Sequence, residues 1–165
     1  MIKAIIVGTP TYVWFLLAVL VVRGLKLRNE AELNIRKMMI VPTLFIVWGL
    51  EKLFNDFSYL GASLAFYIIA AVIGSMIGYN LYQRNRRVFK RDEVIYRSGS
   101  YMPLTIILIN FCVKYTLNVI LAIHTELHQA LNFNILYALF SGLSVGLFVG
   151  GIYQAFKARE AIQNR

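Results

Sequence analysis

Three polar residues recur at every fourth position inside an otherwise apolar stretch of this sequence. They are Asn110, Lys114 and Asn118. In an α-helix this spacing places all three on one face. A cation and two amides within an apolar helix are costly unless they face other helices, and residues of this kind are functional candidates. The stripe could therefore conduct a solute or a proton, or it could hold helices together.

A carboxylate at a similar depth in another apolar stretch offers Lys114 a partner. Glu51 and Lys114 lie nine and eleven residues after the proline near the start of their respective stretches. Lys52 has a nearer partner in Asp56, four residues further along the same helical face. We therefore predict an ion pair between Glu51 and Lys114. Its simplest role is structural, and the alternative is a path for a solute or a proton.

Five apolar stretches must position these residues. They cover residues 5–22, 38–57, 62–82, 101–123 and 134–156. Each is long enough to cross a bilayer as a helix, which needs roughly 17–25 residues. The hydrophobic fraction of 59% also exceeds what a water-soluble domain of 165 residues requires. The sequence predicts an all-α membrane protein whose single domain, residues 1–165, is a bundle of five transmembrane helices.

The basic residues predict the orientation of this bundle. Most of the seventeen Lys and Arg residues lie in segments 23–37, 84–97 and 157–165, and the alternate connections contain none. Basic connections are retained in the cytoplasm, which predicts an N-out/C-in protein of the bacterial cytoplasmic (inner) membrane. The net charge of +9 then reflects topology and contact with anionic lipid headgroups at the cytoplasmic face. Nucleic-acid binding is not expected, because no nucleic-acid-binding motif accompanies the charge.

A small hairpin is expected in the longest cytoplasmic connection, between the third and fourth stretches. Two β-prone runs, Val88–Lys90 and Val94–Arg97, flank the polar residues Arg91–Glu93. Such runs around a short polar segment are typical of paired strands.

Glycines at intervals of four mark two of the apolar stretches. Gly142, Gly146 and Gly150 lie in the fifth stretch, and Gly74 and Gly78 lie in the third. Small residues at this spacing form a flat surface that lets another helix approach closely. The partner helix could belong to this chain, to a second copy or to another membrane protein. We favour a contact within the chain.

Two histidines lie in the connection before the fifth stretch. If this segment is α-helical, His124 and His128 share a face and could ligate a metal or haem. A complete metal site needs a third ligand, and only Glu126 or Asp56 is available nearby. Histidines at a membrane edge are usually interfacial, so we expect no metal and no other cofactor.

Patterns typical of enzymes are missing from the sequence. Cys112 is the only cysteine, which excludes a redox pair within the chain, and there is no Gly-x-Ser-x-Gly motif. We therefore expect a non-enzymatic accessory or scaffold component that associates with a membrane-protein partner or with itself. The alternatives are a small-solute or ion transporter that uses the polar stripe, and a protein that binds metal or haem at its outer face.

Several segments resemble known membrane-protein families. Gly8–Trp14, and the basic pair Arg36–Lys37 that leads into Met38–Pro42, are similar to a group of uncharacterised bacterial membrane proteins. More distantly, Arg36–Pro42, the hairpin Arg87–Arg97 and the embedded cation Lys114 resemble the CcdC-like family. That resemblance implies a membrane protein associated with cytochrome c biogenesis, and it implies no catalytic residues.

Overall fold

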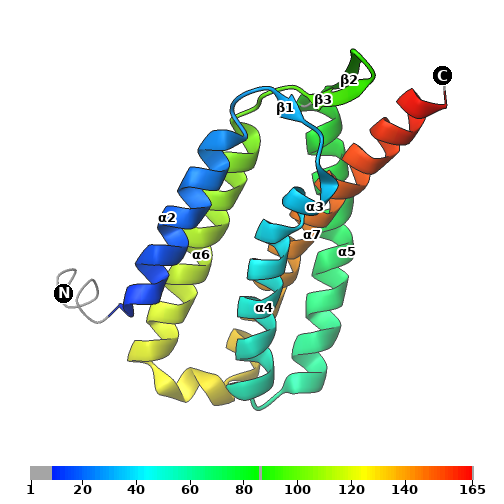
Figure 1. The fold of residues 1–165 in the computed structure, drawn as a ribbon. Helices are drawn as coiled ribbons and strands as arrows, with labels where there is room; N and C mark the ends of the chain where they lie inside the picture. The colour runs from blue at the N-terminus through cyan, green and yellow to red at the C-terminus, as the bar shows by residue number, and fades with distance from the viewer. Residues whose placement is uncertain (1–8, 86, 165) are drawn as a thin grey trace.

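The structure of the protein is a computed structural model that describes residues 9–85 and 87–164. In these residues five long helices run alternately up and down and make up most of the fold (Figure 1). They are α2 (Thr11–Lys26), α4 (Ile40–Asn55), α5 (Leu60–Asn85), α6 (Met102–Ile123) and α7 (Leu131–Gln163). The connections hold α3 (Ile35–Met38), the 3-10 helix η1 (Thr125–Gln129), β1 (Ala31–Glu32), β2 (Val88–Arg91) and β3 (Val94–Arg97).

The length and composition of the helices indicate a membrane protein. Among the described residues, four segments are long and apolar enough to cross a bilayer: Ile35–Asn55, Leu60–Asn85, Met102–Ile123 and Leu131–Gln163. Helix α2 has 16 residues and is shorter than these four, and the beginning of the predicted first span, residues 5–8, lies outside the described residues. Large apolar side chains point outward, including Phe15 and Met76 at 72% and 65% exposure. Lipid is the solvent that suits such a surface.

The observed helix limits differ from the predicted spans mainly at the ends. The predicted fifth span ends at Phe156, whereas α7 continues to Gln163 and carries the basic residues Lys157 and Arg159 beyond the apolar part. Pro42 and Pro103 both lie in the first turn of a helix. The first backbone N–H groups of a helix have no partner inside that helix, so a proline is tolerated there.

The predicted hairpin is confirmed, and it belongs to a larger sheet. Strands β2 and β3 pair antiparallel, with Phe89 opposite Tyr96. Asp92 and Glu93 in the turn have φ angles of 48° and 66°, the sign that type I′ hairpin turns require at both central residues. The sheet has a third strand, β1, and its order is β1-β3-β2. A two-residue strand has no detectable alternation, which is why the sequence did not predict it.

The glycine-rich faces of α5 and α7 pack directly against each other, which confirms the favoured contact within the chain. A Cβ atom at Gly74 would lie 2.6 Å from the carbonyl oxygen of Leu143. On the facing helix, Gly142, Gly146 and Gly150 lie against backbone carbonyl groups of α5. Side chains at these positions would keep the two backbones apart, so the glycines permit the contact.

The remaining helices complete the bundle around this pair. Helix α4 packs on α7, and α2 packs on α6 (Figure 1). Aromatic contacts join α4 and the connection after it to α7: the rings of Phe45 and Phe148 stack at 5.5 Å, and Phe57, just after α4, meets Tyr137 edge to face at 5.2 Å. The stripe on α6 faces this interior.

Candidate functional site

Lys114 lies at the centre of the bundle and has no exposed surface (0%). Its Nζ atom is 5.8 Å from the ring centroid of Trp48 on α4 and 5.4 Å from that of Tyr137 on α7. An ammonium group is attracted to aromatic faces at such distances. Gly49 makes room for it, because a Cβ atom there would lie 2.8 Å from Nζ. Lysine, glycine and aromatic rings from three helices therefore form one centre.

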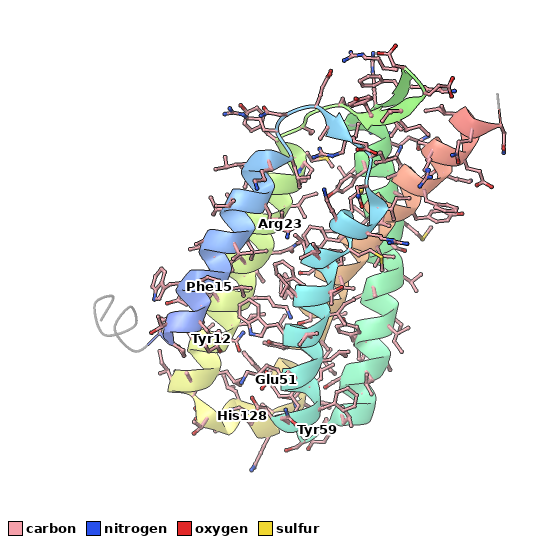
Figure 2. The ribbon with its side chains drawn as sticks, in the orientation of Figure 1. Tyr12, Phe15, Arg23, Glu51, Tyr59 and His128 are labelled. Carbon is pink, nitrogen blue, oxygen red and sulfur yellow. The ribbon has the colours of Figure 1, made fainter. Side chains whose placement is uncertain are left out.

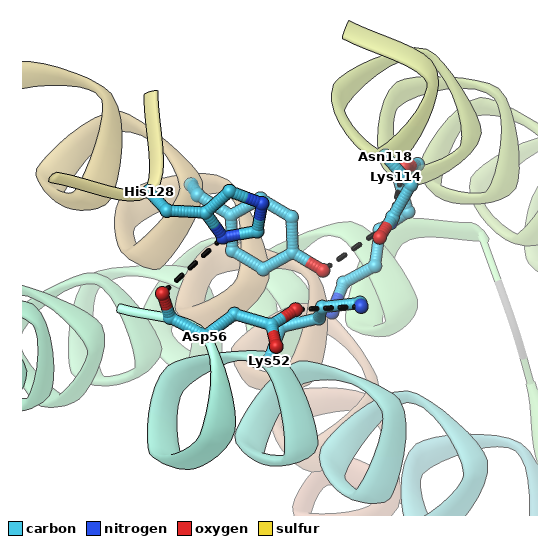
Figure 3. Close-up of polar contacts among 6 residues, drawn as sticks. Lys52, Asp56, Lys114, Asn118 and His128 are labelled. Carbon is cyan, nitrogen blue, oxygen red and sulfur yellow. Dashed lines mark hydrogen bonds and ion pairs between the residues drawn. The ribbon is translucent and has the colours of Figure 1, made fainter. Parts of the chain in front are cut away.

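The two asparagines of the stripe bind neighbouring helices and the backbone of α6. Ser144 on α7 donates a hydrogen bond to Asn110 Oδ1 at 2.8 Å. Asn118 Nδ2 donates to the carbonyl oxygen of Lys114 at 2.8 Å and to the hydroxyl oxygen of Tyr137 at 3.3 Å (Figure 3). The stripe thus faces the bundle interior as its spacing predicts, and its amides connect α6 to α7.

The predicted ion pair between Glu51 and Lys114 is not formed. The side chain of Glu51 is exposed (Figure 2), whereas that of Lys114 is buried. The two residues lie at similar positions along their helices, but the side chain of Glu51 does not point toward Lys114. Each helical residue turns by about 100°, so Glu51 lies about 200° around α4 from Gly49, whose backbone Lys114 Nζ approaches closely. The predicted pair of Lys52 with Asp56 is present at 2.7 Å (Figure 3).

A pocket of about 860 Å³ opens at the sheet end of the bundle. Its walls are largely apolar and come from α2, α4, α6 and α7, with Val19, Ile107 and Phe148 among them. Its charged lining consists of one carboxylate, Glu32, and four basic side chains: Arg23, Lys26, Lys37 and Arg97. The pocket therefore combines an apolar body with a predominantly basic end.

Arg97 is the buried member of this basic set, at 6% exposure. Strand β3 positions it between β1 and β2, and its Nη1 donates to the carbonyl oxygen of Leu27 at 3.2 Å. Burial lowers the pKa of Arg97, yet a guanidinium group stays protonated at physiological pH. Arg97 therefore contributes a positive charge to the pocket lining at physiological pH.

The sequence did not reveal this pocket. Its residues come from segments separated by more than a hundred positions. In the sequence, Arg23 and Lys37 cannot be distinguished from other basic residues that flank a membrane span. Likewise, Trp48 and Tyr137 are aromatic residues within apolar stretches, which normally indicates only core packing.

The two histidines do not share a helical face. Residues Thr125–Gln129 form a 3-10 helix, so a spacing of four no longer aligns His124 with His128. His124 Nδ1 lies 2.9 Å from the carboxylate of Glu126, and His128 Nδ1 lies 3.2 Å from the backbone oxygen of Asp56 (Figure 3). Across residues 9–85 and 87–164, no group of three or more His, Cys, Asp or Glu side chains could hold a metal ion.

Comparison with known proteins identifies one family. The sequence model of a family described as "Family of unknown function (DUF6622)" matches residues 1–161. No curated protein and no solved structure matches the chain. The expectation of an uncharacterised family is thereby confirmed, and the expected likeness to the CcdC-like family is not shown.

Proposed function

We propose a function from one premise: the chain belongs to the DUF6622 family, whose own function is unknown. It is a five-span protein of the bacterial cytoplasmic (inner) membrane with N-out/C-in topology. It acts without catalysing a reaction, as an accessory component that holds an anionic phospholipid in the basic pocket. The observation that carries this proposal is the pocket itself, with apolar walls inside the bundle and basic residues at the end.

The distribution of charge supports the proposed topology. The C-terminal ends of α2, α5 and α7 lie at the same end of the bundle as the three-stranded sheet (Figure 1). Connections 56–59 and 124–130 at the other end contain no Lys or Arg. Helix α2 is about 24 Å long at 1.5 Å per residue, somewhat less than the ~30 Å hydrocarbon layer, and local thinning of the bilayer accommodates such a difference.

Cysteine labelling of intact cells tests this topology. In a Cys112→Ser background, we expect an impermeant maleimide to label Thr125→Cys in η1 and to leave Asp92→Cys in the hairpin unlabelled until the cells are lysed. Both positions are exposed, so access across the membrane decides the result. Labelling of Asp92→Cys in intact cells would contradict the proposed orientation.

The chemistry of the pocket favours a phospholipid over a soluble anion. The bundle end with the basic groups lies where lipid headgroups lie in the proposed topology, and Arg23, Lys37 and Arg97 can contact a phosphate there. The apolar walls contributed by Val19, Ile107 and other residues match an acyl chain. Pockets of roughly 300–1,000 Å³ with mostly apolar walls and a few polar groups are typical ligand sites.

Lipid titration of the purified protein tests the proposed ligand. We expect phosphatidylglycerol to raise the thermal stability in detergent, and phosphatidylcholine or inorganic phosphate at equal concentration to have little effect. The double substitution Arg23→Gln/Lys37→Gln should weaken phosphatidylglycerol binding about 30-fold, because each basic group near an anionic headgroup contributes about 1 kcal/mol.

The matched control removes two positive charges outside the pocket. Arg36 is adjacent to Lys37 in the sequence, Arg84 lies in the last turn of α5, and neither lines the pocket. The variant Arg36→Gln/Arg84→Gln should bind phosphatidylglycerol like the unaltered protein. If both double variants lost phosphatidylglycerol affinity equally, surface charge alone would explain the binding. Stabilisation by inorganic phosphate would indicate a soluble ligand. Either result contradicts the proposal.

Two earlier predictions remain untested. Association with a membrane-protein partner, or with a second copy, is a prediction that gentle purification with mass spectrometry can address. Transport along the stripe also stays a prediction. In the described conformation Lys114 has no exposed surface, so a transport path would require the bundle to open.

A further inference from the structure

Three buried groups near Gly49 have no hydrogen-bond partner among the residues that the structure describes. They are Lys114 Nζ, the hydroxyl of Ser141 on α7 and the hydroxyl of Tyr67 on α5. A Cβ atom at Gly49 would lie 2.8 Å from Lys114 Nζ, 3.5 Å from Ser141 Cβ and 3.7 Å from Tyr67 Cε2. Side chains from three helices thus gather around one backbone position of a fourth.

All three groups are hydrogen-bond donors, and the carboxylates nearby are used elsewhere. Asp56 is paired with Lys52, and the side chain of Glu51 is exposed. A buried donor without an acceptor is costly, and a buried cation without a counter-charge is more costly still. A hydrogen-bond acceptor that carries negative charge would satisfy all three groups at once, because each hydroxyl can donate to it and the ammonium group gains a counter-charge.

The surroundings limit the size of that acceptor. The rings of Trp48 and Tyr137 lie over Lys114 Nζ, and the backbone of Gly49 closes another side. The phospholipid pocket does not include Lys114, Ser141 or Tyr67 in its lining. The centre is thus separate from that pocket, and the close approach of Gly49 and the two rings to Nζ favours a small acceptor over a phosphate ester or an organic acid.

We propose that Lys114, Ser141 and Tyr67 bind a small monovalent inorganic anion of the halide class within the bundle. The lysine supplies the counter-charge, and the two hydroxyls donate hydrogen bonds to the same ion. This site lies in the membrane-embedded part of the molecule and does not depend on the proposed lipid binding.

Fluorescence of Trp48 provides a direct test, because its ring lies 5.8 Å from Lys114 Nζ. Trp14 is the other tryptophan, and Trp14→Phe removes its signal. Iodide, a heavy-atom quencher, is titrated against gluconate at constant ionic strength. We expect saturable quenching of Trp48 that chloride reverses by competition. Quenching that rises linearly without saturation would overturn the proposal, and water molecules would then be the partners of these donors.

Substitutions assign the quenching to the centre. Lys114→Met should abolish the saturable component, and Ser141→Ala should weaken iodide binding about tenfold while Trp48 remains quenchable. Lys157→Met removes the same charge at an exposed position on α7 and should leave iodide binding unchanged. The Arg23→Gln/Lys37→Gln variant should also bind iodide normally, which separates this proposal from the lipid-binding proposal. Saturable quenching that persists in Lys114→Met would overturn it.

Discussion

Replacing Gly146 by alanine is expected to lower the stability of the bundle by about 3 kcal/mol, the upper part of the range for overpacked cores. The new methyl group would meet the carbonyl oxygen of Ala71 and would lie 2.8 Å from the backbone nitrogen of Ser75. Both atoms belong to the backbone of α5, so no side-chain rotation relieves the contact. The two helices must separate, and the packing along their whole interface weakens.

Thermal or denaturant-induced unfolding in detergent measures this effect, with Gly61→Ala as the matched control. Gly61 also lies in α5, and a Cβ atom there would have no neighbour within 4 Å. The control should change the stability by less than about 0.5 kcal/mol, as surface substitutions usually do. If Gly146→Ala were as mild as Gly61→Ala, α5 and α7 would not be packed as closely as described.

Replacing Lys114 by methionine is expected to raise the stability by about 1–3 kcal/mol when halide is absent. Methionine has a similar length and can fill the space between Trp48 and Tyr137 without a desolvated charge. Exchanging buried charged groups for apolar residues of similar volume is often stabilising by 1–4 kcal/mol. The loss of the contacts between the cation and the rings, worth about 0.5–2 kcal/mol, reduces this gain.

The measurement is unfolding in gluconate buffer, with Glu51→Gln as the control. Because Glu51 is exposed and forms no ion pair with Lys114, its substitution should leave the stability within about 0.5 kcal/mol. A loss of about 3–5 kcal/mol in Lys114→Met would instead indicate that the lysine is paired with a carboxylate. The same loss in Glu51→Gln would identify that carboxylate as Glu51.

Local patterns predicted the helices and the hairpin well, because each depends on neighbouring residues. The apolar runs, the prolines in the first turn of α4 and α6, and the spacing of the glycines all survive in the structure. The Lys52–Asp56 pair was also predictable, since both residues belong to one helix turn.

Contacts between helices were harder to predict. The rotation of α4 about its axis decides whether Gly49 or Glu51 faces Lys114, and the depth of a residue along the helix carries no information about that rotation. Strand β1 and the 3-10 form of η1 were missed for a related reason, because both are short segments shaped by the elements they contact.

The amino-acid sequence by itself determined that this chain forms apolar helices suited to a bilayer, where the basic connections lie, and which helix faces carry glycine or polar residues. These properties follow from composition and from the helical period. Only the tertiary structure decided that Lys114 lies among aromatic rings and hydroxyls, with no ion-pair partner among the described residues, and that Arg97 and three other basic residues line one pocket. The physical reason is that both sites depend on how each helix is oriented about its own axis and on how the helices pack. That packing is set by the shapes of all the helices together.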